Sequence, residues 1–257
     1  MAARGRWGEP PVARMYIACI QVPGMWSIVE KSALATSRHR ECMCPMGKSN
    51  LKDLAYKTIK KNIIECVFLP GSFVRDCDLV EQLGISRTPI REAISRLEQE
   101  NFVKIIPQRG VMVQGVGYRE ISDIFQVRGI IEPYILRNYS EQLDIGRMRE
   151  LKAGFLRAKA EDNEADKYRL DDELHAAIRS LCPNKYLVDL LDNIYEQNHR
   201  LRILCGKSKA RLEKSVDEHI EILELMAAGS IEEASACLEK HIQNSKTSAI
   251  NLFIASH

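Results

Sequence analysis

Three amphipathic segments, the first two closed by a turn signal, constrain the fold of residues 50–115 more than any other feature of the chain. In the first, 51–67, apolar residues recur at helical spacing until a Pro-Gly pair stops the pattern. The second, 78–83, ends at Gly84, which suits the left-handed position after a helix. A third helix begins after Ser86, a residue type that caps helix N-termini well. Two short helices joined by a glycine-containing turn predict a helix-turn-helix.

A hairpin with basic residues nearby follows the third helix. Segments 102–106 and 111–113 are apolar runs separated by Pro-Gln-Arg-Gly, which predicts strand, turn and strand, a small wing. The start of the third helix is the end that meets bases and phosphates in such motifs. A single arginine is more often a solvated surface charge, but several basic and hydroxyl groups on one edge favour DNA contact. The candidates are Arg87, Thr88, Arg91 and, at the tip of the wing, Arg109.

The run GISRTPIREAISRLEQENFVKIIPQRGVMV resembles the DNA-binding domain of the GntR family of bacterial transcription factors. The resemblance implies double-stranded operator DNA as a partner. It assigns operator contacts to the start of the third helix and to the wing, at Ser86, Arg87, Thr88, Arg91, Arg109 and Gly110. Many relatives carry an arginine at the start of the second helix, where this sequence has Cys77, and we expect Arg75 to take its place.

From residue 118 to the end, the sequence predicts helices throughout. After Pro133 there is one further proline, Pro183, and there is no alternating apolar pattern with hairpin signals. The helical segments have the lengths of bundle helices. The fold class predicted is therefore mainly α, with an N-terminal winged helix-turn-helix domain followed by an all-α helical bundle.

Four residues of metal-binding types, one Asp and three His, fall on three of the predicted bundle helices. His175 follows Asp171 by four residues, which places both side chains on one helix face. His219 and His241 lie on the last two helices. An isolated helix histidine is more often a surface or hydrogen-bonded core residue, but together these four could close on one divalent transition metal and leave a position open for a ligand.

The stretches DDELHAAIRSLCPNKYLVDLL, DEHIEILELMAAGSIEEA and ACLEKHI resemble the signature stretches of the FCD effector domain in the FadR subfamily. The resemblance implies that Asp171, His175, His219 and His241 bind a metal, zinc or nickel most often, and that a small carboxylate is the effector. Arg128 matches an arginine that relatives place at the effector pocket. Arg200 and Arg202 are further candidates to neutralise the carboxylate.

Composition bounds the class of protein. With 45% hydrophobic and 28% charged residues, the chain has the balance of a soluble globular protein, and no apolar run is long enough to cross a membrane. Its eight cysteines are spread without a convincing secretory signal, which favours reduced thiols and a cytoplasmic location. The resemblance to bacterial transcription factors implies a bacterial cytoplasm, with nucleoid association when the protein is bound to DNA. Net charges of +4, +2 and −4 for residues 1–50, 51–115 and 116–257 place a polyanion partner at the N-terminal side.

The expected domains are a disordered extension at 1–49, a winged helix-turn-helix at 50–115 and an all-helical domain for effector binding and dimerisation at 116–257. The extension has no sustained helical or strand period, and Met43 or Met46 is an alternative start of the native protein. A homodimer is expected because one winged motif offers few contacts and a two-fold protein matches a palindromic operator.

The function predicted is a non-enzymatic, sequence-specific transcriptional regulator, a repressor, that responds to a small carboxylate. One alternative is a metal-dependent hydrolase-like enzyme, since such a centre could activate water. Against it, no additional positioned acid or base is evident. The other alternative is an acyl-CoA-responsive regulator, but that branch of the family lacks the metal residues.

Overall fold

The computed structural model describes residues 48–205 and 208–255 and divides into two compact units, with the boundary between Gly115 and Val116. The predicted extension at 1–49 lies outside the described residues except for its last two positions, which are helical. No helix in the described ranges is both long and apolar enough to span a bilayer.

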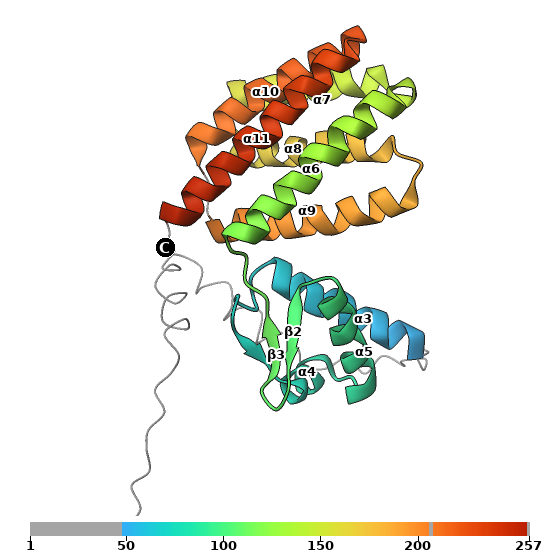
Figure 1. Cartoon of the computed structure of the whole chain (residues 1–257), viewed down its shortest axis with the longest axis vertical. Coiled ribbons are helices and arrows are strands. Elements are labelled where there is room, and N and C mark those ends of the chain that lie inside the picture. The colour runs from blue at the N-terminus through green and yellow to red at the C-terminus, as the bar shows by residue number, and fades with distance from the viewer. Residues whose placement is uncertain (1–47, 206–207, 256–257) are drawn as a thin grey trace, which may run out of the picture. The chain divides into compact units, whose positions relative to one another are not determined.

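The first unit is a winged helix-turn-helix (Figure 1). Its elements are α3 (Lys48–Ile64), β1 (Phe73–Val74), α4 (Asp76–Leu83), α5 (Arg87–Gln99), β2 (Val103–Ile106) and β3 (Gly110–Val113). The strands form an antiparallel sheet in the order β1-β3-β2. The sequence analysis did not predict β1, because a two-residue strand is too short for an alternating pattern to show.

Turn residues and a buried stripe fix the geometry of this unit. Gly84 follows α4 with φ 64°, the left-handed conformation that glycine adopts without strain, and its N–H donates to the Val80 carbonyl. On α5, Ile90 and Leu97 are fully buried, while the N-terminal polar side chains remain exposed. Packing of the apolar stripe therefore orients the polar edge of α5 outward.

The second unit is an all-helical bundle (Figure 1). It comprises α6 (Tyr118–Tyr139), a 3-10 turn η1 (Ser140–Gln142), α7 (Ile145–Ala160), α8 (Glu164–Ser180), α9 (Lys185–Cys205), α10 (Lys209–Ala228) and α11 (Ile231–Ala255). Helix α6 packs along α11, and α10 packs along both α7 and α11. The predicted fold class, mainly α with a winged helix-turn-helix followed by a helical bundle, is confirmed.

The core of the bundle is apolar around a polar centre. Ile121, Leu174 and Leu238 are fully buried members of one continuous hydrophobic cluster. Buried with them are charged and imidazole side chains, among them Arg128 and Glu132. Buried charges are costly unless they are paired or bind an ion, so this polar centre marks a candidate functional site.

Candidate metal centre and ligand pocket

Four side chains from three helices converge inside the bundle. Asp171 and His175 come from α8, His219 from α10 and His241 from α11. Each offers one ligand atom, and these four atoms all lie within 4.8 Å of one another. The three imidazoles are 1–2% exposed. The structure therefore brings together all four residues that the sequence analysis singled out; whether they hold a metal stays a prediction.

Two of the ligand-atom distances in this cluster are close to those around a bound transition metal. His219 Nε2 lies 3.2 Å from both His241 Nε2 and Asp171 Oδ1, and His175 Nε2 lies 3.8 Å from the same carboxylate oxygen. With metal bonds of about 2.0–2.1 Å, neighbouring ligand atoms lie roughly 3 Å apart. The donor set of three imidazole nitrogens and one carboxylate oxygen is one that zinc and nickel accept.

Two carboxylates set the orientation of two of the histidines. Glu132 Oε2 lies 2.7 Å from His175 Nδ1, and Glu218 Oε2 lies 2.7 Å from His241 Nδ1. A carboxylate at this distance accepts a hydrogen bond, so each Nδ1 carries the proton and each Nε2 presents its lone pair to the cluster. Carboxylates that orient metal-binding histidines in this way are a recurrent feature of metal sites.

Glu132 is fully buried and has a second partner. Arg128 Nε donates to Glu132 Oε1 at 2.8 Å, one turn away on α6. Burial alone would raise the pKa of Glu132, but the nearby Arg128 guanidinium and His175 lower it well below its usual range. The carboxylate is therefore ionised, and Arg128 and His175 share its charge.

His219 differs from the other two histidines. Its Nδ1 is buried with no hydrogen-bond partner among the described residues, and its ring lies against Phe155 with 5.1 Å between centroids. Burial, together with the neighbouring imidazoles, lowers the pKa of both His219 and His241. Both are thus neutral near pH 7, the form in which imidazole binds metals.

Asp171 is held by an arginine from α9. Arg202 donates to Asp171 Oδ2 at 3.0 Å and to Asp172 at 2.6 Å, while Asp171 Oδ1 faces the histidines. Burial alone would raise the pKa of Asp171, but His219, His175 and Arg202 lower it well below its usual range. Arg202 therefore positions the carboxylate of the cluster.

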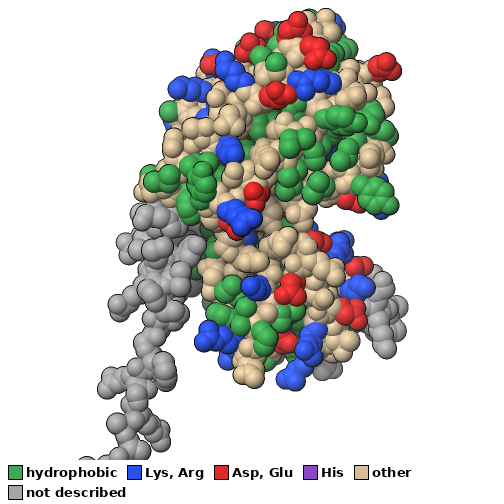
Figure 2. Space-filling model, in the orientation of Figure 1, with side chains coloured by type: hydrophobic (Ala, Val, Ile, Leu, Met, Phe, Trp, Pro, Cys, Tyr) green, Lys and Arg blue, Asp and Glu red, His purple; other side chains and the backbone are tan. Residues whose placement is uncertain are grey.

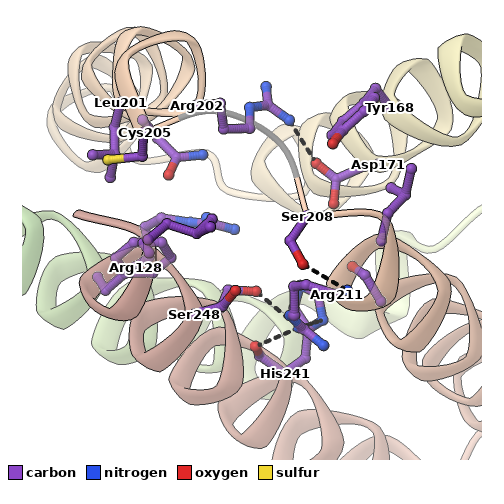
Figure 3. Close-up of a pocket in the computed structure, with 17 residues that line it drawn as sticks. Arg128, Tyr168, Asp171, Leu201, Arg202, Cys205, Ser208, Arg211, His241 and Ser248 are labelled. Carbon is purple, nitrogen blue, oxygen red and sulfur yellow. Dashed lines mark hydrogen bonds and ion pairs between the residues drawn. The ribbon is translucent and has the colours of Figure 1, made fainter. Parts of the chain in front are cut away.

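A pocket of about 120 Å³ opens beside the cluster (Figure 3). Its lining comes from α6, α8, α9, α10 and α11, and it includes Asp171 and His241 of the cluster. Arg128 and Arg202, two of the three predicted effector-binding arginines, also line it.

Arg200, the third predicted effector arginine, is fully buried and is not among the residues that line this pocket. The reason is helical phase, since Asn198, Leu201 and Cys205 line the pocket and Arg200 projects from a different side of α9.

Arg211 is the pocket arginine that sequence reasoning missed. It donates to Glu218 at 2.6 Å and to Ser245 at 2.9 Å, and its terminal nitrogen lies 3.4 Å from His241 Nδ1. Burial alone would raise the pKa of Glu218, but hydrogen bonds from His241, Arg211 and Asn244 lower it to about 2. Arg211 lies eight residues before His219 on α10, an interval that places both side chains on one broad face of the helix. This spacing is the sequence signal that could have indicated it.

Six of the seven predicted DNA-contact residues lie at the start of α5 and in the β2–β3 hairpin of the winged unit. Ser86 stands at the N-cap of α5 without a side-chain cap bond, and Arg87, Thr88 and Arg91 are exposed on its first turns. Arg109 is exposed in the turn between β2 and β3, next to Gly110 at φ 105°.

Arg75 takes part in an ion pair within its own unit. It is the N-cap of α4, and its guanidinium makes two hydrogen bonds to Asp78, at 2.9 and 3.0 Å. Its predicted contact with DNA stays a prediction.

A winged helix-turn-helix followed by a helical unit with a buried polar pocket is the architecture of a DNA-binding regulator with a sensing domain. Residues 51–113 match the bacterial regulatory proteins of the gntR family, and residues 123–244 match the FCD domain. The chain belongs to the GntR family of transcriptional regulators, in the FadR-like arrangement with an FCD effector-binding domain.

Relatives support this assignment. The Nta operon transcriptional regulator of Aminobacter aminovorans is 28% identical over 68% of this chain and 83% of its own length. The HTH-type transcriptional repressor RspR of Escherichia coli is 20% identical over 73% of this chain and 84% of its own length. These proteins and the family are transcriptional regulators, a non-enzymatic class, so the hydrolase alternative is set aside.

The fold is also found in solved structures. The crystal structure of a GntR transcriptional regulator from Rhodococcus sp. RHA1 is similar over 79% of this chain and 98% of that chain, with a TM-score of 0.66 and 20% sequence identity. At this level of identity, the likeness concerns the fold alone.

Proposed function

We propose that this protein is a homodimeric, metal-containing repressor in the bacterial cytoplasm whose affinity for its operator changes when a small carboxylate binds in the helical domain. The observation that carries the proposal is the convergence of Asp171, His175, His219 and His241 beside a pocket that Asp171 and His241 line. A chain with this site and a DNA-binding unit has the two parts that a ligand-responsive regulator needs.

The metal proposed is zinc or nickel, held by Asp171 Oδ1 and by Nε2 of the three histidines. When bound, it would supply a coordination position for an oxygen atom of the effector. Two features support this proposal: Glu132 and Glu218 fix the Nε2 lone pairs of His175 and His241 toward the cluster, and burial lowers the pKa of His219 and His241. Without an ion, the partly buried carboxylate of Asp171 would face three imidazole rings.

Charge in and around the pocket favours an anionic effector. Three arginines line the pocket, namely Arg128, Arg202 and Arg211. Four carboxylates are bonded to them, namely Glu132, Asp171, Asp172 and Glu218. These groups leave one net negative charge, which a dication would turn into one net positive charge. A single carboxylate would then neutralise the site.

The winged unit is proposed to bind operator DNA with α5 in the major groove and the β2–β3 turn beside it. The exposed Ser86, Arg87, Thr88 and Arg91 at the start of α5 support this role, since that end reads the groove in such motifs. Repression is proposed because the related RspR is named a repressor.

The partner for dimerisation is proposed to be a second copy meeting an apolar face of the bundle. Figure 2 shows hydrophobic side chains gathered over α6 and the start of α9. On these two helices, Ile130, Tyr134, Tyr186 and Leu190 are between 44% and 87% exposed. A contiguous exposed apolar patch is typical of an interface. If Ile130→Asp leaves the molar mass measured by light scattering unchanged, this face is not the interface.

The proposal as a whole is tested with full-length protein purified without added metal. Metal content is measured by mass spectrometry, and affinity for operator DNA by fluorescence anisotropy at fixed salt, with and without chelator and a panel of small carboxylates. We expect about one zinc or nickel per chain and a carboxylate-dependent change in operator affinity. The proposal would be contradicted if the purified protein contained no metal and its operator affinity were the same with and without each carboxylate.

A further inference from the structure

The ligand pocket changes character along one face of α11. His241, Ser245, Ser248, Ala249 and Leu252 line it and lie on one side of the helix. At about 1.5 Å per residue, the backbone of Leu252 is roughly 16 Å along the helix from that of His241. This face therefore runs from the metal-ligand cluster through two hydroxyls to an apolar end.

Other helices extend the apolar end. Leu201 and Cys205 on α9 line the pocket, and Figure 3 shows them on the opposite side of the drawn space from Asp171 and Arg211. Burial raises the pKa of the Cys205 thiol to about 11, so this group is uncharged near pH 7. The wall away from the cluster thus offers hydrocarbon and a neutral thiol.

The cluster end provides the complementary polar contacts. Arg211 lines the pocket and uses its terminal nitrogen for Glu218 and Ser245. Its Nε is buried and has no hydrogen-bond partner among the described residues. A ligand oxygen at this end would supply the partner that the Nε–H group lacks.

The size of the pocket limits the ligand. Its volume is about 120 Å³. For comparison, an apolar protein cavity of roughly 150 Å³ binds benzene. A molecule with about the number of non-hydrogen atoms in benzene fits, whereas an acyl-CoA does not.

We propose that the pocket takes a short-chain aliphatic monocarboxylate, with its carboxylate beside Arg211 and the cluster and its hydrocarbon chain against Leu201, Cys205, Ala249 and Leu252. This inference rests on the proposed function and narrows its effector class. The single net positive charge of the zinc-loaded site favours one carboxylate over two, and the apolar end disfavours a chain that carries hydroxyl groups.

The test is isothermal titration of zinc-loaded, full-length protein with acetate, propionate, butyrate, valerate, succinate and gluconate. Affinity should rise about fourfold for each added methylene until the pocket is full, because each buried CH₂ contributes a roughly constant free energy. Succinate and gluconate should bind more weakly than butyrate. Tighter binding of either one would overturn the inference and leave the carboxylate response intact, whereas no binding by any acid would overturn both.

Two variants test where the hydrocarbon chain of the acid lies in the pocket. Leu252→Ser should weaken butyrate binding about tenfold and leave acetate binding unchanged, because acetate does not reach that wall. Ile254→Ser, two residues further on the same helix and 63% exposed outside the pocket, is the matched control. Ala249→Leu should move the preferred acid to a shorter chain. Equal losses for acetate and butyrate in Leu252→Ser, or an unchanged chain-length preference in Ala249→Leu, would contradict the placement.

Discussion

Glu132 Oε2 lies 2.7 Å from His175 Nδ1, and each of the two side chains is at most 1% exposed to solvent. The hydrogen bond fixes the proton on Nδ1 and leaves Nε2 to face Asp171, His219 and His241. Because Glu132 also binds Arg128, one buried carboxylate connects the cluster to one of the three arginines that line the pocket. A change at Glu132 should therefore affect both metal binding and folding.

Glu132→Gln is predicted to lower metal affinity by about 10–100-fold, the usual effect of losing a carboxylate that orients a histidine ligand. It should also destabilise the metal-free protein by about 3–5 kcal/mol, because Arg128 is left as an unpaired buried charge. Chelator competition measures the first effect, and urea unfolding in EDTA the second.

Glu218→Gln is the matched comparison, because Glu218 orients His241 but its side chain is 23% exposed. It should lose metal affinity to a similar extent with a smaller loss of metal-free stability. Equal metal affinity in wild type and both variants would show that the carboxylates do not orient the ligands.

Metal removal is predicted to lower the melting temperature of the helical unit. An ion bound only by the folded state stabilises it by RT ln(1 + [M]/Kd), about 2.7 kcal/mol at a free concentration of 100 Kd. His219→Ala should reproduce the effect of chelator, and chelator should then have no further effect. Differential scanning calorimetry with and without EDTA measures both. A chelator shift in His219→Ala as large as in wild type would place the metal elsewhere.

Sequence spacing predicted the residues of the cluster because helical geometry turns a four-residue interval into one shared face. Asp171 and His175 needed no tertiary information to be placed together, and resemblance joined them to His219 and His241. The winged hairpin could be predicted from the sequence in the same way, since turn residues and apolar runs are local signals. Strand β1 was not, because its two residues pair with β3 through backbone hydrogen bonds.

The pocket was harder to predict because it depends on which residues face it from five helices. Arg200 and Arg202 are two residues apart, and nothing local in the sequence distinguishes the buried one from the one that binds Asp171. Arg211 was missed because its partners Glu218 and Ser245 lie on two helices whose relative rotation is set by packing.

Arg91→Ala is predicted to weaken operator binding by about 1–3 kcal/mol, as expected for one lost base or phosphate contact. Its ion pair with Asp76, at 3.7 Å and with the arginine side chain 76% exposed, contributes little to folding. The fold should therefore persist. Anisotropy titrations at several salt concentrations measure the change. The control is Arg149→Ala, which changes an exposed arginine on α7 of the helical unit and should leave operator affinity unchanged. If Arg91→Ala binds the operator as tightly as this control does, Arg91 is not part of the DNA interface.

Glu100→Gln is predicted to destabilise the winged unit in a pH-dependent way. Burial alone would raise the pKa of Glu100, but hydrogen bonds from Lys60, Tyr56 and Arg96 lower it below its usual value. A lowered pKa means that the stabilisation is complete above the unfolded value near 4.5 and is lost as the pH falls through the folded value.

At pH 7, the loss in Glu100→Gln should be about 1 kcal/mol, because the site is only partly buried. The difference from wild type should shrink below pH 4.5. Hydrogen exchange of the α3 and α5 amides, corrected for its intrinsic pH dependence, measures it. Glu92→Gln, whose side chain is 55% exposed and lies 3.8 Å from Lys52, is the control. A constant difference between pH 3 and pH 7 would show that the charge of Glu100 is not the cause.

Asp171→Asn is predicted to separate operator binding from effector response. In wild type, the acid that binds best should change operator affinity by about 1–3 kcal/mol, and operator DNA should change the affinity for that acid by the same factor, because binding linkage is reciprocal. Asp171→Asn keeps the shape of the side chain but removes the charge that faces three histidines, so it should bind operator as the chelator-treated wild type does and show no effector shift. Asp172→Asn is the control, because Asp172 also pairs with Arg202 but is 50% exposed and outside the cluster. A full effector shift in Asp171→Asn would show that the response does not pass through this site.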